Sequence, residues 1–186
     1  MKEQHVSPEM KTTPPQSPSV RSRLLTEAKE TVLNVRHIPG IIRIALIGSL
    51  TTHKPDPKDA DLLVTVTDEM NLALLAKLGR RLCGHAQRFN KGGEIFLSNP
   101  QGRYIGRICH WKECGPGIRG SCDALNCGQR HYLHDDFNSV RLRDELIAAP
   151  PLELWPQIIA RVSVPEDVER LLLAPLQQHV AQPHGL

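Results

Sequence analysis

The 186-residue sequence has few aromatic side chains, little net charge and no long apolar run. Its most apolar stretch, residues 41–50, contains Arg43 and is shorter than the roughly 18 apolar residues that a membrane span requires. The polar start, MKEQHVSPEM, has no apolar signal core, so we expect a cytoplasmic protein without a membrane partner. The 40% apolar and 4% aromatic residues are typical of one globular domain with tails, which argues against a multidomain enzyme.

The five cysteines are an odd number, in a chain that shows no export signal. A framework of disulfides is therefore not expected, and either reduced thiols or a metal site accounts for them.

Charge is unevenly distributed along the chain. The net charge of +3 is too small to indicate nucleic-acid binding by itself. Residues 77–143, however, carry twelve basic and five acidic side chains, whereas residues 144–186 carry two basic and six acidic ones. The middle segment could attract a phosphate-rich ligand, although scattered, solvated arginines fit the same count.

Breakers and apolar periodicity divide the chain into three parts. Residues 1–22 are proline-rich and polar, which predicts a disordered tail because they cannot bury enough apolar surface. Residues 23–143 form the predicted main domain, and residues 144–186 a helical extension. β-Branched runs predict strands at 41–47, 61–66, 94–97 and 104–108. Helical spacing and capping residues predict a helix from Leu24 to Pro39, a helix that begins at Thr67 or Asp68, and a helix from Ser163 to about Leu173.

Two aspartates stand at the start of the second predicted strand. Asp59 and Asp61 are two positions apart, so on a strand their carboxylates would share one face. Two like charges this close need a neutralising partner, and Mg²⁺ prefers such oxygen ligands. A solvated turn with two incidental aspartates is the alternative.

A glycine and a serine end the preceding strand. Gly48 would allow the backbone to approach a phosphate closely, and Ser49 would offer an N–H and a hydroxyl to its oxygens. Both groups of residues therefore point to one phosphorylated ligand bound with a cation.

Together these residues resemble the signature of the DNA polymerase β-type nucleotidyltransferase superfamily, particularly its small stand-alone members. The resemblance spans residues 24–110 and lies in the apolar strand that ends in Gly48-Ser49, a loop of about ten residues, and Asp59-Ala60-Asp61 before a second apolar strand. It implies an α+β fold with a mixed sheet flanked by helices. It also implies Mg²⁺ or Mn²⁺ on Asp59 and Asp61, with the terminal phosphates of the nucleotide at Gly48 and Ser49.

The resemblance implies a third carboxylate and phosphate-binding side chains in the loop. Glu94 opens the strand where the third acid of the family tends to lie, although most relatives have aspartate there. The loop lacks the usual arginine-and-glycine pattern, and Lys54 and Lys58 could contact phosphates instead. Weaker candidates for the third acid are Asp123, Asp135 and Asp136.

The predicted function is transfer of a nucleoside monophosphate from a magnesium-bound NTP, such as ATP, to a protein, nucleic-acid or small-molecule acceptor. Asp59 and Asp61 would hold the metal, and Glu94 would bind it or accept the proton of the acceptor. Two alternatives stay open: a non-catalytic binding or antitoxin-like module of the same fold, and a zinc-stabilised nucleic-acid-binding domain.

Cysteine and histidine are concentrated in residues 109–134. Thiolates and imidazoles are the usual ligands of structural zinc, so a structural Zn²⁺ ion is one interpretation of this density. In the alternative, Cys109 points into the core and the other thiols lie in a glycine-rich loop. His131, His134, Asp135 and Asp136 could add a metal ligand or a base, or could be solvated loop residues. The possible zinc ligands are Cys109, Cys114, Cys122 and Cys127.

Overall fold

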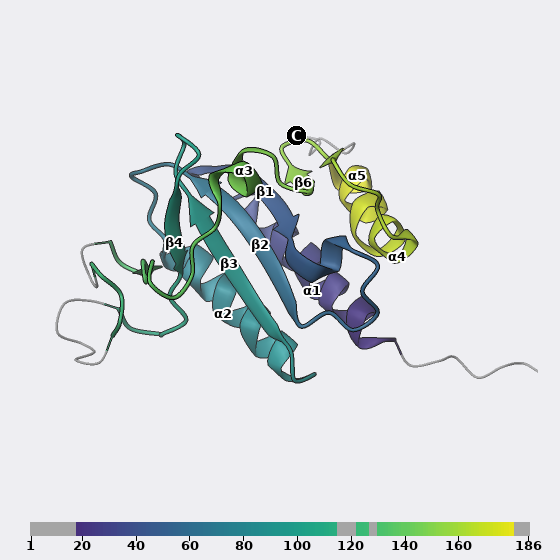
Figure 1. Cartoon of the computed structure of the whole chain (residues 1–186), viewed down its shortest axis with the longest axis horizontal. Coiled ribbons are helices and arrows are strands. Elements are labelled where there is room, and N and C mark those ends of the chain that lie inside the picture. The colour runs from purple at the N-terminus through teal and green to yellow at the C-terminus, as the bar shows by residue number, and fades with distance from the viewer. Residues whose placement is uncertain (1–17, 115–121, 127–129, 181–186) are drawn as a thin grey trace, which may run out of the picture.

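A single seven-stranded sheet organises the chain (Figure 1). The computed structural model describes residues 18–114, 122–126 and 130–180. Its strand order is β5-β4-β3-β2-β1-β6-β7, in which β2 and β3 are parallel and every other neighbouring pair is antiparallel. The predicted α+β class with a mixed sheet is confirmed. The strands are β1 (Ile41–Ile47), β2 (Asp59–Val66), β3 (Gly92–Ser98), β4 (Tyr104–Ile108), β5 (Leu133–His134), β6 (Leu152–Trp155) and β7 (Ile159–Ala160).

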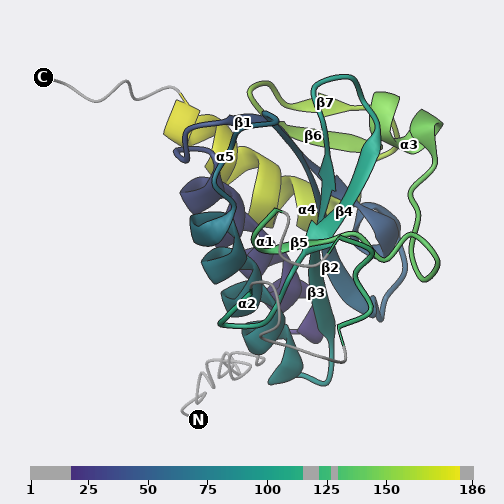
Figure 2. The ribbon, with the colours of Figure 1, turned by 90° about the vertical axis from the view of Figure 1, so that its left-hand side faces the viewer.

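Helices cover the two faces of the sheet unequally (Figure 2). The large apolar core lies under α1 (Val20–Val35), α2 (Ala73–Gln87) and the continuous C-terminal run of α4 (Glu166–Val168), η2 (Glu169–Leu173) and α5 (Ala174–Val180). A smaller apolar cluster on the other face includes Ile147 of α3 (Asp144–Ala148). One end of this second face is therefore left to polar side chains. We call the second face of the sheet, opposite the large core, the open face.

Alternation along β2 sorts its side chains between the two faces. Ala60 and Leu62 are fully buried in the large core, whereas Leu63 belongs to the smaller cluster. Since side chains alternate along a strand, Asp59 and Asp61 project onto the open face with Leu63. Because an apolar run follows the two acids along β2, the acids lie at the edge of the apolar core, where a ligand can reach them.

Several predicted elements occur where they were expected. The strands at 41–47 and 104–108 match β1 and β4 residue for residue, and β3 and β4 pair as an antiparallel hairpin. Helix α1 begins at Val20, inside the predicted tail of residues 1–22, because the Ser19 hydroxyl caps it by accepting from the Ser22 N–H. The rest of that tail, residues 1–17, lies outside the described residues.

The predicted helical extension, residues 144–186, contains strands as well as helices. Strand β6 pairs with β1 and carries β7 along its outer edge, so this segment completes the main sheet. The short run Leu152–Trp155 stands between prolines, and its length of four residues hid its strand character. In the described ranges no helix is both long and apolar enough to cross a membrane.

Candidate functional site

Three carboxylates converge on the open face at the start of β2 and β3. Asp61 lies directly opposite Glu94 in the parallel register of these strands, and Asp59 lies opposite Gly92. A Cβ atom on Gly92 would collide with Asp59 Oδ1, so only glycine leaves space for this carboxylate. The structure thus brings Asp59, Asp61 and Glu94 together, and we call them the carboxylate cluster.

The electrostatics of the cluster reflect this crowding. Burial, with the neighbouring charges of Asp59 and Glu94, raises the pKa of Asp61 to about 7. Burial also raises the pKa of Glu94, although the Arg107 guanidinium opposes that shift. Glu94 Oε2 is buried and has no hydrogen-bond partner among the described residues. A divalent cation would relieve the repulsion between the three acids, and their oxygen donors fit Mg²⁺ or Mn²⁺.

The glycine at the end of β1 touches the carboxylate cluster. Gly48 opens a short 3-10 turn, η1 (Gly48–Thr51), with a φ angle of +74°. A Cβ atom at this position would lie 2.8 Å from Asp61 Oδ2. Both the backbone conformation and the close approach therefore require glycine, and they set the turn beside the acids as the sequence predicted.

A buried arginine anchors this turn, and sequence reasoning missed it. Arg21 of α1 donates to the carbonyl oxygens of Leu50 and Lys54, each at 3.0 Å. Its Nε atom lies 2.5 Å from Asp167 Oδ2 near the C-terminal helices. The sequence signal for it is the helical spacing that puts Arg21 on the apolar face of α1 with Leu24 and Leu25. In the structure Arg21 is only 7% exposed. A charged side chain on a buried face needs a partner, and here the partners are the turn and the following loop.

A second arginine lies between Glu94 and another buried acid. Arg107 Nη1 is 3.6 Å from Glu94 Oε2, and its Nη2 is 2.9 Å from Asp136 Oδ2. His110 Nε2 lies 3.7 Å from the same Glu94 oxygen. Asp135 and Asp136 are each only 3% exposed, so the interpretation of the His131–Asp136 stretch as solvated loop residues was wrong for these two acids. Asp136 joins the site through Arg107, whereas Glu94 stands beside the aspartates.

The remaining predicted phosphate contacts lie farther along the loop. Ser49 is half-buried in η1, where its carbonyl accepts from the Thr52 hydroxyl at 2.8 Å. Lys54 and Lys58 are both exposed. The charge of Lys54, together with a stronger contact from Lys91, lowers the pKa of Asp56. The side chains of both lysines are therefore available to a ligand, whereas their backbone carbonyls accept from Arg21 and from the Gly92 N–H.

The predicted zinc-ligand cysteines occupy the segment after β4. Cys109 is buried, and burial raises the pKa of its thiol, with smaller contributions from Cys114 and Cys122. Cys114, Cys122 and also Cys83 on α2 are half-buried free thiols. The prediction for Cys127 lies outside the described residues.

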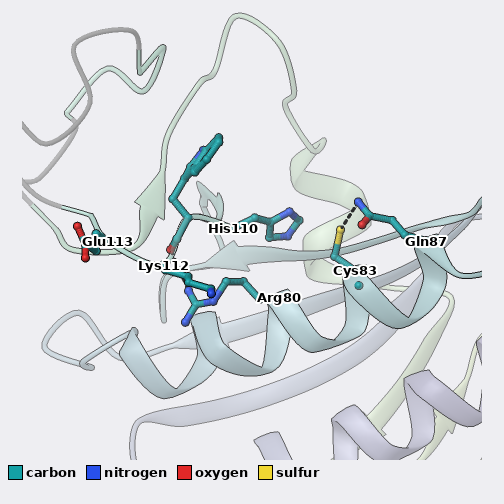
Figure 3. A pocket seen from close by; sticks show the side chains of 8 residues that line it. Arg80, Cys83, Gln87, His110, Lys112 and Glu113 are labelled. Atoms are coloured by element: carbon teal, nitrogen blue, oxygen red, sulfur yellow. Dashed lines mark hydrogen bonds between the residues drawn. The ribbon is translucent and has the colours of Figure 1, made fainter.

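A hollow of about 710 Å³ opens between α2 and the segment after β4 (Figure 3). Arg80, Cys83 and Gln87 line it from the helix, and His110 and Lys112 line it from the opposite segment. In Figure 3 the His110 ring extends over the helix towards Cys83 and Gln87. Because His110 also approaches Glu94, this hollow adjoins the carboxylate cluster through one imidazole.

Comparison with known proteins identifies no relative. None of the protein-family models, curated proteins or solved structures compared with the chain is significantly similar to it. The geometry of the residues is therefore the ground for any functional assignment.

Proposed function

We propose that this protein is a metal-dependent nucleotidyltransferase with the fold of the DNA polymerase β-type superfamily. The observation that carries the proposal is the convergence of Asp59, Asp61 and Glu94 on the open face, with Gly48 in contact range of Asp61. The order of elements supports the fold assignment, since the glycine turn ends β1, two acids open β2, and the third acid opens the parallel strand β3.

The carboxylate cluster is suited to a hard cation. Asp59 and Asp61 would hold Mg²⁺ or Mn²⁺, with Glu94 as a third ligand or as the proton acceptor. When bound, the metal would stabilise the negative charge that develops on the phosphoryl oxygens and on pyrophosphate.

The other residues of the site would bind and orient the nucleotide. The Gly48-Ser49 turn would present backbone N–H groups to the triphosphate, and Lys54 and Lys58 would close on it from the loop. Arg107 would orient Glu94 through their 3.6 Å contact. The acceptor would enter from the side of the hollow, where His110 lies between Glu94 and open space.

The charge of this part of the chain favours an acidic or phosphorylated acceptor surface. Arg80 and Lys112 line the hollow with one acid, Glu113, and residues 77–143 carry twelve basic and five acidic side chains. Protein and nucleic-acid acceptors share this chemistry, so the assay must present both.

A transfer assay tests the proposal. The purified chain is incubated with each NTP labelled at the α-phosphate, with Mg²⁺ or Mn²⁺, and with cell lysate, and labelled protein and nucleic acid are separated. We expect a labelled product that requires the divalent cation and that disappears with Asp59→Ala. Asp68→Asn is the matched control, because Asp68 is exposed just beyond the other end of β2.

Three outcomes would count against the proposal. Labelling that persists in Asp59→Ala would show that another protein or another site performs the transfer. Tight nucleotide binding without any turnover would favour the non-catalytic or antitoxin-like module. Nucleic-acid binding without metal-dependent nucleotide affinity would favour the zinc-stabilised nucleic-acid-binding domain.

A further inference from the structure

Two thiols, those of Cys109 and Cys114, lie just beyond the end of β4. Cys109 follows the strand directly and is 5% exposed. The Cys109 N–H donates to the Tyr132 carbonyl at 2.8 Å. Cys114 Sγ also accepts the Tyr132 N–H at 3.3 Å, so backbone from the far end of the segment turns back onto this cluster.

A third thiol, that of Cys122, adjoins a histidine and an aspartate. One ligand atom each from Cys122, Asp123 and His134 lie within 4.8 Å of one another. The His134 side chain is 12% exposed on β5, and its Nε2 atom is buried with no hydrogen bond among the described residues. That nitrogen nevertheless lies 3.1 Å from Asp123 Oδ1 and 3.3 Å from Asp136 Oδ2. The Nε2 side of the ring therefore faces two carboxylates beside the Cys122 thiol.

We infer that Cys122 and His134 hold one zinc ion and that Cys109 and Cys114, which lie beside Tyr132, close on it as the third and fourth ligands. Three thiolates and one imidazole form a closed tetrahedral donor set that selects zinc over magnesium. Because the remaining ring nitrogen of His134 would donate to a neighbouring carboxylate, Asp136 or Asp123 would fix the orientation of the ring. His134 was grouped by sequence only with a general histidine and aspartate cluster, and the fold brings it to the thiols.

The surrounding structure explains why a metal would be useful here. Outside the two-residue strand β5, the described part of residues 109–134 is held by isolated contacts, such as the 2.8 Å bond from the Cys109 N–H to the Tyr132 carbonyl. A structural ion would join these contacts into one unit. The same unit reaches the carboxylate cluster, since His134 adjoins Asp136, which binds Arg107, which contacts Glu94.

Metal analysis of the purified full-length chain tests the site. We expect about one equivalent of zinc per chain, and at least a roughly tenfold loss of zinc affinity in Cys122→Ser and His134→Gln. Cys83→Ser is the matched control, because Cys83 lies on α2 and pairs with Gln87 outside the cluster. Replacement of zinc by cobalt should give the thiolate charge-transfer absorption of a tetrahedral site.

A measurement on the unmodified protein covers the case in which a cysteine variant fails to fold. Thiol titration with and without a zinc chelator should show Cys109, Cys114 and Cys122 becoming reactive only after the metal is removed. Substoichiometric zinc after incubation with Zn²⁺ and dialysis, or equal zinc retention by wild type and Cys122→Ser, would overturn the inference. Neither readout involves a nucleotide, so a failure of this inference is distinct from a failure of the proposed function.

Discussion

The carboxylate cluster and the thiol cluster, by which we mean Cys109, Cys114 and Cys122 with His134, are neighbouring regions built in different ways. The acids stand on adjacent strands in the middle of the sheet, where register fixes Asp61 opposite Glu94. The thiols and His134 come from a segment whose only regular element in the described residues is the short strand β5. One region is therefore organised by the backbone of the sheet, and the other is organised by its own side chains.

This difference also separates the chemistry of the two regions. Oxygen ligands with crowded negative charge suit a hard cation that exchanges and accepts phosphate, whereas sulfur and nitrogen ligands suit a cation that stays bound. Arg107 stands between the regions, because it contacts Glu94 on one side and Asp136 on the other. The two regions are expected to differ in metal identity and exchange, and to be coupled through this one guanidinium.

The largest expected effect is on activity. Asp61→Asn keeps the shape of the side chain and removes one charge from the carboxylate cluster, so it should lower the rate of nucleotidyl transfer by roughly 10²–10³-fold. Zinc content should stay unchanged, since the thiol cluster does not include Asp61. Transfer rates and zinc content measured on the same preparation check both parts. A loss of both would show that the two regions form one unit.

Removal of the linking guanidinium should be the next largest effect. Arg107→Met removes the 2.9 Å ion pair of Asp136, which is 3% exposed, and leaves the His134 ring as its neighbour, so stability should fall by up to about 3–5 kcal/mol. Urea unfolding measures the loss of stability. Arg103→Met is the control, because Arg103 is exposed in the same hairpin just before β4 and should change stability by less than about 0.5 kcal/mol. Equal effects would contradict the coupling role of Arg107.

The glycine turn offers a smaller and more local test. Gly48→Ala places a methyl group 2.8 Å from Asp61 Oδ2 at a φ angle of +74°, which should cost about 1–3 kcal/mol in the free energy of unfolding. It should also weaken Mn²⁺ binding, because Asp61 must move. Gly84→Ala in α2 is the matched control, since its added Cβ meets open space and alanine is the better helix former by about 1 kcal/mol.

The pH dependence of stability should show the smallest effect. Without added Mg²⁺, the folded-state pKa of Asp61, about 7, exceeds its ordinary value of 3.8, so the folded state binds more protons between these values. The contribution of Asp61 to stability is therefore present at acidic pH and is lost as the pH rises towards 7. Asp61→Asn should remove this slope, which is at most about 1.4 kcal/mol per pH unit, and so raise the free energy of unfolding near neutral pH.

Thermal unfolding across this pH range, with and without Mg²⁺, checks the expectation. Added Mg²⁺ should restore stability at neutral pH in wild type and have little effect in Asp61→Asn. Asp68→Asn, whose carboxylate is exposed, should follow wild type in both conditions. A wild-type protein that gains stability from acidic to neutral pH without Mg²⁺ would contradict the crowding of the three acids.

Sequence reasoning was most successful where the two-residue period of a strand determines the face onto which a side chain projects. Asp59 and Asp61 share a face because they are two positions apart on a strand, and Glu94 joins them because its strand runs parallel at matching register. Reasoning was weaker where long-range packing decides the contacts. Arg21 reaches the glycine turn only through the placement of α1, and His134 reaches Cys122 only through the fold of the loop. Neither pairing has a fixed spacing, so the sequence alone could not predict it.

Sequence reasoning did not predict strand β6, for a related reason. A run of four residues between prolines carries too little pattern to distinguish a strand from a loop, and its assignment depends on pairing with β1. Likewise, the helix that the sequence predicted from Ser163 begins at Glu166, and Pro165 takes the N-cap position of α4 without a side-chain hydrogen bond. The helix still begins there, since burial of Val168 and Leu172 stabilises it.

Binding of Mn²⁺, monitored by electron paramagnetic resonance, tests most directly whether Asp59, Asp61 and Glu94 form a divalent-cation site. Wild type and Asp68→Asn should bind Mn²⁺ saturably, Mg²⁺ should displace the bound Mn²⁺, and NTP should tighten the binding. Asp59→Asn and Asp61→Asn should lose the Mn²⁺ binding. If the two cluster variants bind Mn²⁺ as well as wild type does, the cation is held elsewhere and the carboxylate cluster is not a metal site.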